Sequence, residues 1–379
     1  MTCYLDNSAT TKPTQAVVDA MVCCMQEGYH NPSSLYAPAL EVEKLITACR
    51  TLIAERLNAE QVFFTSGGTE ANNLAIFGAL KGMRKKGKVL YSAGEHPSVL
   101  ETCKQAQYLG FEPEEIPLSQ NGVLQLGALR SQLKEDVSLI CIMHVNNETG
   151  SIQPIHEVAK LRDSLQPDAL LHVDGVQGFL RLPMDMRGWG VDCYALSGHK
   201  IHASKGIGAL ALGGRTRLTP LFCGGGQEAA IRSGTENTPG IAGLKKAIET
   251  YPAAHNMQNV KMKLFSMLQA GIENLAVNGP EPDAAEAAPH ILNVSFPPVR
   301  AETMLHALEG DQIYVGNGSA CSSKKKQISH VLAAMGSSVS QAESAIRFSL
   351  NPFLTEEDIQ YAAKCCIQHY QVLKKFIRR

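Results

Sequence analysis

Up to about residue 250 this 379-residue chain alternates short apolar runs with amphipathic stretches, and that alternation is the strongest constraint on its fold. The apolar runs favour strands buried on both faces, whereas the amphipathic stretches have helical spacing. The alternation therefore predicts an α/β fold with a mostly parallel sheet between layers of helices. The predicted strands are 62–65, 89–91, 139–145, 170–174, 193–196 and 207–212, and the predicted helices include 69–81, 98–107 and 154–164.

Beyond about residue 250 the pattern changes to that of a smaller α+β unit. It predicts a long helix at 256–275, a loop at 279–283, a strand at 291–296, a helix at 301–308 and a closing helix at 355–378. We therefore expect a large domain at 13–255 and a small domain made of 1–12 together with 256–379.

Charge and apolar content exclude several classes of protein. Lys plus Arg number 35 and Asp plus Glu 36, so the net charge of −1 gives no reason to expect nucleic acid as the main ligand. No apolar run approaches the ~18 residues of a membrane helix, and residues 1–6 lack the basic start and apolar core of a signal peptide. These features predict a soluble, cytoplasmic protein that binds neither membrane nor nucleic acid.

The 11 cysteines indicate neither a disulfide framework nor a metal site. Their number is odd, no pair has CxxC spacing, and most fall on apolar faces, so we expect them reduced and buried. Cys321 differs, because Gly316–Ser323 surrounds it with small and polar residues and Lys324–Lys326 follows. Such a segment favours an exposed, reactive thiolate, although an ordinary turn would look similar.

Polar residues follow the predicted strands directly, where ligands gather in such sheets. Ser66–Glu70 joins a strand to a helix, and its glycines and helix N-terminus could bind a phosphate or simply cap the helix. Asp174 ends another strand and could hold a cationic ligand nitrogen or cap the next helix.

Two basic residues also lie in unusual surroundings. Lys200 follows the strand that ends at residue 196, where partial desolvation would free its amine for imine formation, with Lys205 as a competing candidate. Arg347 lies in the apolar run 345–349 and needs an anionic partner there. That partner could be a substrate carboxylate or a structural Asp or Glu.

Taken together and in this order, these motifs resemble the cysteine desulfurases, the NifS/IscS-like branch of the class V aminotransferases, which are fold-type I pyridoxal-phosphate enzymes. The resemblance covers nearly the whole chain. The segments that carry it are 4–11, 31–34, 66–73, 95–96, 144–150, 172–174, 197–200, 232–237, 318–321 and 346–349. It implies a seven-stranded sheet in the large domain.

The resemblance also implies a role for each candidate residue. Lys200 would bind pyridoxal 5'-phosphate as an imine and move the Cα proton, while Asp174 would pair with the pyridine nitrogen. His96 would stack on the ring and assist proton transfer, and Gln177 would contact the phenolic oxygen. The residues implied to bind the phosphate are Gly68, Thr69, Ser197 and His199, with Thr235 contributed by the partner subunit of a homodimer. Asn147 and Arg347 would hold the substrate carboxylate.

The implied reaction converts L-cysteine to L-alanine and leaves the sulfur as a persulfide on Cys321. A sulfur-acceptor protein, either an iron–sulfur scaffold or a tRNA-thiolating enzyme, would then receive it. No metal site is expected, and transient ligation of an iron–sulfur cluster by Cys321 stays open. A selenocysteine lyase and a non-catalytic scaffold that binds the cofactor or phosphate are the alternatives. His30, the segment 201–204 and Lys324–Lys326 depart from the family pattern.

Overall fold

The computed structural model describes residues 2–252, 255–317 and 328–376. Its largest element is a seven-stranded sheet with the strand order β2-β8-β7-β6-β5-β3-β4. The strands are β2 (Gln61–Thr65), β3 (Lys88–Ser92), β4 (Glu112–Ile116), β5 (Val137–Met143), β6 (Leu170–Asp174), β7 (Cys193–Ser197) and β8 (Gly208–Leu212). Neighbouring strands from β7 to β4 are parallel, and β8 is antiparallel to both β7 and β2. The predicted α/β fold with a mostly parallel sheet is confirmed.

Helices cover both faces of this sheet because alternate strand residues point to opposite sides. They are α1 (Gln15–Gln26), α2 (Ala37–Leu57), α3 (Gly68–Gly82), α4 (Pro97–Gln105), α5 (Leu126–Gln132), α6 (Ile155–Leu165), α7 (Met186–Trp189) and α8 (Thr238–Thr250). One face packs mainly against α2, α5, α6 and α8, and the other against α3 and α4. Short 3₁₀ turns η1 (Ala106–Leu109), η2 (Gly198–Lys200) and η3 (Glu228–Ala230) interrupt the loops.

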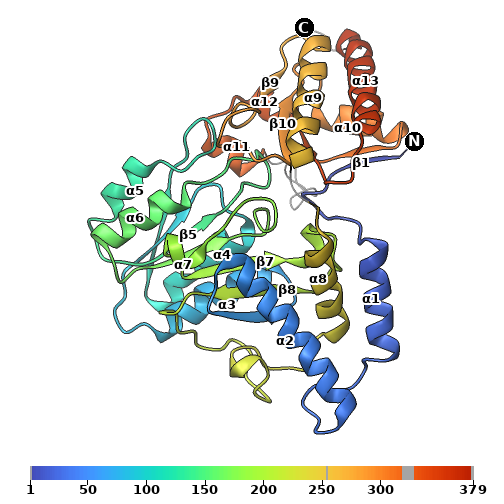
Figure 1. Ribbon diagram of the computed structural model, residues 1–379. Helices are drawn as coiled ribbons and strands as arrows, with labels where there is room; N and C mark the ends of the chain where they lie inside the picture. Colours follow the sequence, from blue (N-terminus) through green and yellow to red (C-terminus); the bar gives the residue numbers. More distant parts are fainter. Residues whose placement is uncertain (1, 253–254, 318–327, 377–379) are drawn as a thin grey trace.

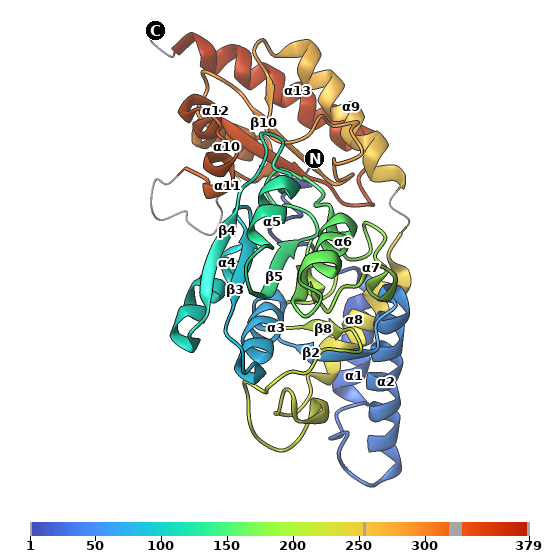
Figure 2. The ribbon, with the colours of Figure 1, turned by 90° about the vertical axis from the view of Figure 1, so that its left-hand side faces the viewer.

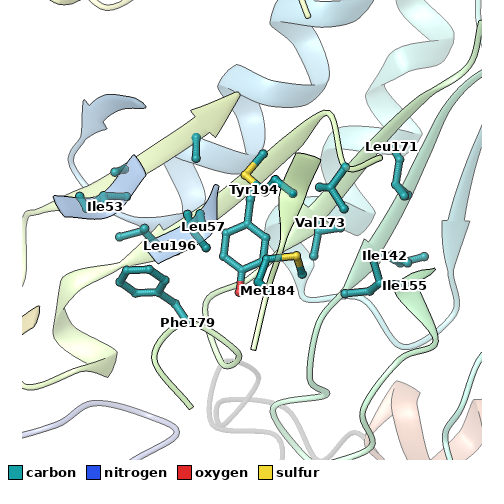
Figure 3. Packing of buried hydrophobic residues seen from close by; sticks show 14 of the residues in the cluster. Ile53, Leu57, Ile142, Ile155, Leu171, Val173, Phe179, Met184, Tyr194 and Leu196 are labelled. Carbon is teal, nitrogen blue, oxygen red and sulfur yellow. The ribbon is translucent and has the colours of Figure 1, made fainter. Parts of the chain in front are cut away.

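The core on the first face is centred on the fully buried ring of Tyr194 in β7 (Figure 3). Leu196, Phe179 and Met184 lie beside the ring, and Val173 continues the layer across β6. This close packing holds the ends of β6 and β7 in place, and both strands carry predicted site residues at those ends.

The second unit is built on smaller sheets (Figures 1 and 2). β12 (Ala345–Ser349), β10 (Ile291–Ser295) and β9 (Ala276–Val277) form one antiparallel sheet, and β1 (Cys3–Leu5) pairs in parallel with β11 (Ile313–Val315). The N-terminus therefore lies among elements from the far end of the chain (Figure 1). The helices of this unit are α9 (His255–Gly271), α10 (Ala301–Gly310), α11 (His330–Ala334), α12 (Val339–Glu343) and α13 (Glu356–Leu373), followed by η5 (Lys374–Phe376).

The two units have separate clusters of buried apolar side chains. The cluster of the smaller unit combines Cys3 and Leu5 with residues from Val260 to Tyr370. Val331 and Leu332 of α11 pack instead against the cluster of the large sheet. The domain division at 12/13 and 255/256 stays a prediction.

Each predicted strand and helix has a counterpart in the described residues, but the sequence pattern missed others. β4 reads Glu-Pro-Glu-Glu-Ile and lacks an apolar run, since it is an edge strand whose side chains are largely solvent-accessible. α1 and α2 precede the first predicted strand and were not predicted. Within the described residues no helix combines the length and apolar character needed to cross a bilayer.

Candidate active site

A cavity of about 650 Å³ lies at the carboxyl ends of β2, β3, β5, β6 and β7, with β12 and the segment before α11 on its other side. It is the position where open α/β sheets bind ligands. Ten of the predicted site residues line it: Gly68, Thr69, His96, Asn147, Asp174, Gln177, Ser197, His199, Lys200 and Arg347. The tertiary structure therefore brings these ten together, although they span nearly 280 positions of the chain.

Asp174, the last residue of β6, lies at the floor of the cavity with 5% of its surface exposed. Its Oδ1 accepts a hydrogen bond from the Val176 backbone N–H at 3.0 Å, and its Oδ2 accepts one from Asn72 Nδ2 at 2.8 Å. A carboxylate held in this way keeps a fixed orientation and can pair with a ligand cation.

Lys200 ends η2, directly after β7. Its Nζ donates to the backbone carbonyls of Ser8 at 2.5 Å and Ala9 at 2.7 Å. The guanidinium of the buried Arg181 donates to the Lys200 carbonyl and so fixes the turn from behind. Lys205 is exposed and does not line the cavity, so the geometry favours Lys200 as the amine of this site.

The predicted phosphate cradle is the turn between β2 and α3. Gly67 has φ +154°, and a Cβ on Gly68 would lie 2.7 Å from Val176 Cγ2 and 3.6 Å from Ser197 Cβ. The backbone of Gly68 approaches Val176, which follows β6, more closely than a side chain would allow. The first N–H groups of α3 and the hydroxyls of Thr69 and Ser197 are therefore available to an anion.

His199 lies beside this cradle, where its Nδ1 is 3.1 Å from Thr10 Oγ1. Burial lowers the pKa of His199 to about 4, and the nearby charges of Lys200 and Lys205 act in the same direction. The ring is therefore neutral at physiological pH and acts as a hydrogen-bonding group. Thr235 lies in an exposed loop and does not line the cavity of its own chain.

Gln177 is oriented by two contacts. Its Oε1 accepts a hydrogen bond from Arg181 at 3.2 Å, and its Nε2 donates to the Ser8 carbonyl at 3.0 Å. The amide therefore presents its nitrogen as the donor on the cavity side, which suits contact with an anionic oxygen.

Arg347 enters the cavity from β12 and has several partners. One guanidinium nitrogen lies 2.7 Å from Asp6 Oδ1, and another donates to the Asn147 carbonyl at 2.9 Å. Its buried Nε has no hydrogen-bond acceptor among the described residues. The sequence left two possible partners for Arg347, a structural acid and a substrate carboxylate. The structure supplies the acid as Asp6, and the Arg347 Nε remains as a donor for a substrate carboxylate.

Sequence reasoning gave no role to Glu148, Ser329 or His330, which also line the cavity. Ser329 Oγ donates to Glu148 Oε2 at 2.5 Å, and His330 Nε2 lies 3.0 Å from the Glu95 carbonyl. Burial raises the pKa of Glu148, although the Ser329 hydrogen bond opposes that rise. Glu148 lies in a motif segment already noted, but no spacing signal marked its contact with Ser329.

Cys321 and Lys324–Lys326 lie outside the described residues, so their predicted roles stay predictions. In the described part of the chain no cluster of three His, Cys, Asp or Glu side chains could hold a metal ion.

The residues of the cavity fit the predicted cofactor. A phosphorylated pyridine aldehyde needs an anion cradle, a carboxylate for its ring nitrogen and an amine for its aldehyde. Thr69, Asp174 and Lys200 supply these groups within one cavity.

Comparisons with known proteins agree with this geometry. A family model described as Aminotransferase class-V matches residues 3–362. A protein named cysteine desulfurase from Nostoc sp. is 38% identical over 363 residues, which cover 94% of this chain and 90% of that protein. A solved structure named NifS-like protein is 33% identical with a TM-score of 0.89, covering 98% of this chain and 100% of the other. The structure titled SspA in complex with cysteine is 31% identical with a TM-score of 0.82, covering 93% and 100%.

Proposed function

The chain belongs to the aminotransferase class-V family, which depends on pyridoxal 5'-phosphate, and is a cysteine desulfurase; from this premise we propose how its own residues perform the reaction. Lys200 binds the cofactor covalently through Nζ, and Asp174 keeps the pyridine nitrogen protonated. Gly68, Thr69, Ser197 and His199 bind the phosphate. With the cofactor bound, His96 would stack on the ring and Gln177 would donate to the phenolic oxygen.

The bound cofactor supplies one kind of chemistry, because its ring delocalises the electron pair left when a bond at the substrate α-carbon breaks. Arg347 and Asn147 orient L-cysteine by its carboxylate. The substrate amine releases Lys200 from its covalent bond, and the freed Lys200 Nζ takes the Cα proton. The Cys321 thiolate then bonds to the substrate sulfur while the Cβ–S bond breaks, and its electron pair stays on Cβ. Protonation of that carbon and return of the proton from Lys200 Nζ to Cα give L-alanine, and Cys321 keeps the sulfur as a persulfide.

The observation that carries this proposal is the meeting of Lys200, Asp174 and Arg347 at one cavity. The test is mass spectrometry of the protein after brief exposure to L-cysteine. We expect one added sulfur on Cys321 in the wild type and none in Cys321→Ser, which should still bind the cofactor. Sulfur on another cysteine, or full alanine formation by Cys321→Ser, would contradict the assignment.

Lys200 and Lys205 are the two candidates for the amine that binds the cofactor, so the same substitution can be compared at both positions. Lys200→Ala should abolish the visible absorbance of the bound cofactor, whereas Lys205→Ala should retain it. A borohydride-reducible link at Lys205 would reverse the assignment.

The protein acts as a homodimer in this proposal, with Thr235 reaching the partner subunit's phosphate site. Large apolar side chains are exposed along the region from α1 to the start of α2, which suits burial against a second copy. They are Val18, Val22, Met25, Tyr29, Leu35, Tyr36 and Leu40. Sedimentation should give twice the chain mass of 40.9 kDa, and Thr235→Val should weaken cofactor binding. A monomer with full activity would refute it.

The sulfur acceptor is an iron–sulfur scaffold or a tRNA-thiolating enzyme in the same compartment. We place the protein in the cytoplasm, because the ten cysteines of the described residues are all unpaired, as in a reducing compartment. Transfer of ³⁵S from loaded protein to each acceptor class would decide between the two.

A further inference from the structure

A row of polar side chains connects Asp174 to His96 beside the cavity. Asn72, with 1% of its surface exposed, donates from Nδ2 to Asp174 Oδ2 at 2.8 Å and to Ser98 Oγ at 2.9 Å. Its Oδ1 lies 2.9 Å from His172 Nε2. Ser98 in turn contacts His96 Nδ1 twice, through Oγ at 2.8 Å and through its backbone N at 3.1 Å.

One backbone N–H determines where the protons of this row lie. The Ser98 N–H can only donate, so His96 Nδ1 must present its lone pair. The Ser98 hydroxyl faces the same acceptor and donates to it as well, so its oxygen must accept from Asn72. That requirement places the Asn72 NH₂ group toward Ser98 and its carbonyl oxygen toward His172, whose Nε2 then carries a proton.

We propose that Ser98 is a positioning residue that fixes the tautomer of His96, with Nδ1 unprotonated and the proton on Nε2. Asn72 assists by orienting the Ser98 hydroxyl. Ser98 contacts only Nδ1, so Nε2 is left to interact with a ligand in the cavity that His96 lines. His96 therefore serves the cavity as a hydrogen-bond donor, and the substrate Cα proton goes to a different group.

Charged groups around His96 also affect whether its ring takes up a second proton. The groups that face it are Asp174 at the end of β6, Lys200 in η2 and His330 in α11. Burial, Lys200 and His330 disfavour a second ring proton, and Asp174 favours one. The balance lowers the pKa of His96, which agrees with a neutral ring whose single proton is assigned by hydrogen bonding.

This inference rests on the proposed function, because it concerns the same site. Its test separates a failure of the inference from a failure of the proposed function. The protein is prepared with ¹⁵N-labelled histidine rings, and ring nitrogen shifts are recorded with the cofactor bound and again for the cofactor-free full chain. Comparison with His96→Gln assigns the His96 signals among the 12 histidines. The tautomer in the cofactor-free chain is measured without any turnover, so it does not depend on desulfurase activity.

We expect the form of His96 with Nε2 protonated to predominate in the wild type. In Ser98→Ala the ratio of Nδ1–H to Nε2–H should rise about tenfold, roughly the value of one lost hydrogen bond. Ser98→Thr retains the hydroxyl and should restore the wild-type ratio. Thr102→Val is the matched control, because Thr102 Oγ1 donates to the Ser98 carbonyl in the same helix without contacting His96.

Two results would overturn the proposal. One is a wild-type His96 with Nδ1 protonated, which can be observed even if Ser98→Ala fails to fold. The other is the same ratio in folded Ser98→Ala and wild type. An equal change in Thr102→Val would show a general disturbance of α4, and it too would refute a specific role for Ser98.

Discussion

At the scale of single residues, the active site depends on buried polar groups whose partners come from distant segments. Arg347 shares its guanidinium between Asp6 and the Asn147 carbonyl, which leaves the buried Nε available. An Arg in this position is held rigidly before any substrate binds, and preorganisation of this kind reduces the entropy cost of binding.

We predict that Arg347→Lys lowers kcat/KM for L-cysteine about 100-fold, mainly through KM. Lysine keeps the charge beside Asp6 but cannot offer the planar pair of donors that a carboxylate binds. Steady-state alanine formation measures the effect, and cofactor absorbance should stay at the wild-type level. A loss confined to kcat would place Arg347 in the chemical step instead.

Lys261 in α9 is a second buried basic residue, far in sequence from those of the cavity. Its side chain is 0% exposed, and Nζ donates to the Ala288 carbonyl at 2.8 Å. Burial lowers the pKa of Lys261 from 10.5 to about 8, although Asp283 opposes this shift. Between these two values the unfolded chain binds a proton that the folded chain lacks, so this group makes the free energy of unfolding rise with pH.

We therefore predict that the free energy of unfolding of Lys261→Met, relative to wild type, falls by about 2 kcal/mol between pH 7 and pH 9.5. Denaturant titrations at the two pH values measure it. Lys263→Met on the same helix, which removes a solvent-accessible lysine paired with Glu356, should show no such trend. A flat difference for Lys261→Met would mean that Lys261 stays charged throughout.

At the scale of elements, the 3₁₀ turn η3 has a strained backbone that the side chain of Glu228 fixes in place. Glu228, Ala229 and Ala230 have φ of 50°, 54° and 62°, a left-handed conformation that costs non-glycine residues energy. The turn is held because Glu228 accepts hydrogen bonds from Arg50 at 2.7 and 2.8 Å and from the Phe64 N–H at 2.8 Å. It begins the loop that carries Thr235.

We predict that Ala230→Gly raises the free energy of unfolding by up to about 1 kcal/mol, because glycine adopts positive φ without a steric penalty. The control is Ala20→Gly in the middle of α1, where the same change should cost about 1 kcal/mol. Thermal or denaturant unfolding measures both. Destabilisation by Ala230→Gly would show that η3 is not strained.

At the scale of the whole molecule, residues 5–12 connect the two units. Leu5 packs in the core of the smaller unit, Asp6 pairs with Arg347, and the carbonyls of Ser8 and Ala9 receive the Lys200 amine. Thr11 continues the connection, because its N–H and hydroxyl both donate to the His199 carbonyl. The smaller unit thus reaches Lys200 through one short segment.

We predict that Leu5→Ala lowers the free energy of unfolding by roughly 2–4 kcal/mol and also weakens cofactor retention. Leu264→Ala in the same core should cost a similar amount, since Leu264 is equally buried. It should leave cofactor retention unchanged, because Leu264 packs in the core of the smaller unit and no described residue of α9 lines the cavity. Gel filtration followed by absorbance measures retention. Equal losses in both variants would show that only general stability matters.

The sequence alone predicted six of the seven strands of the large sheet and ten of the residues that line its cavity. Apolar periodicity and motifs such as 197–200 are local properties, and local pattern is enough to read them. The sequence pattern did not predict β4, because an exposed edge strand carries no apolar run.

Only the tertiary structure decided which residues act together. The pairing of Asp6 with Arg347 and the link from Asn72 to His96 depend on how sheets and helices pack. Asp6 and Arg347 are 341 positions apart, and Asn72 and Asp174 are 102 apart. Spacing along the chain carries no signal for such contacts, since they form only when the buried apolar faces of distant elements close on each other.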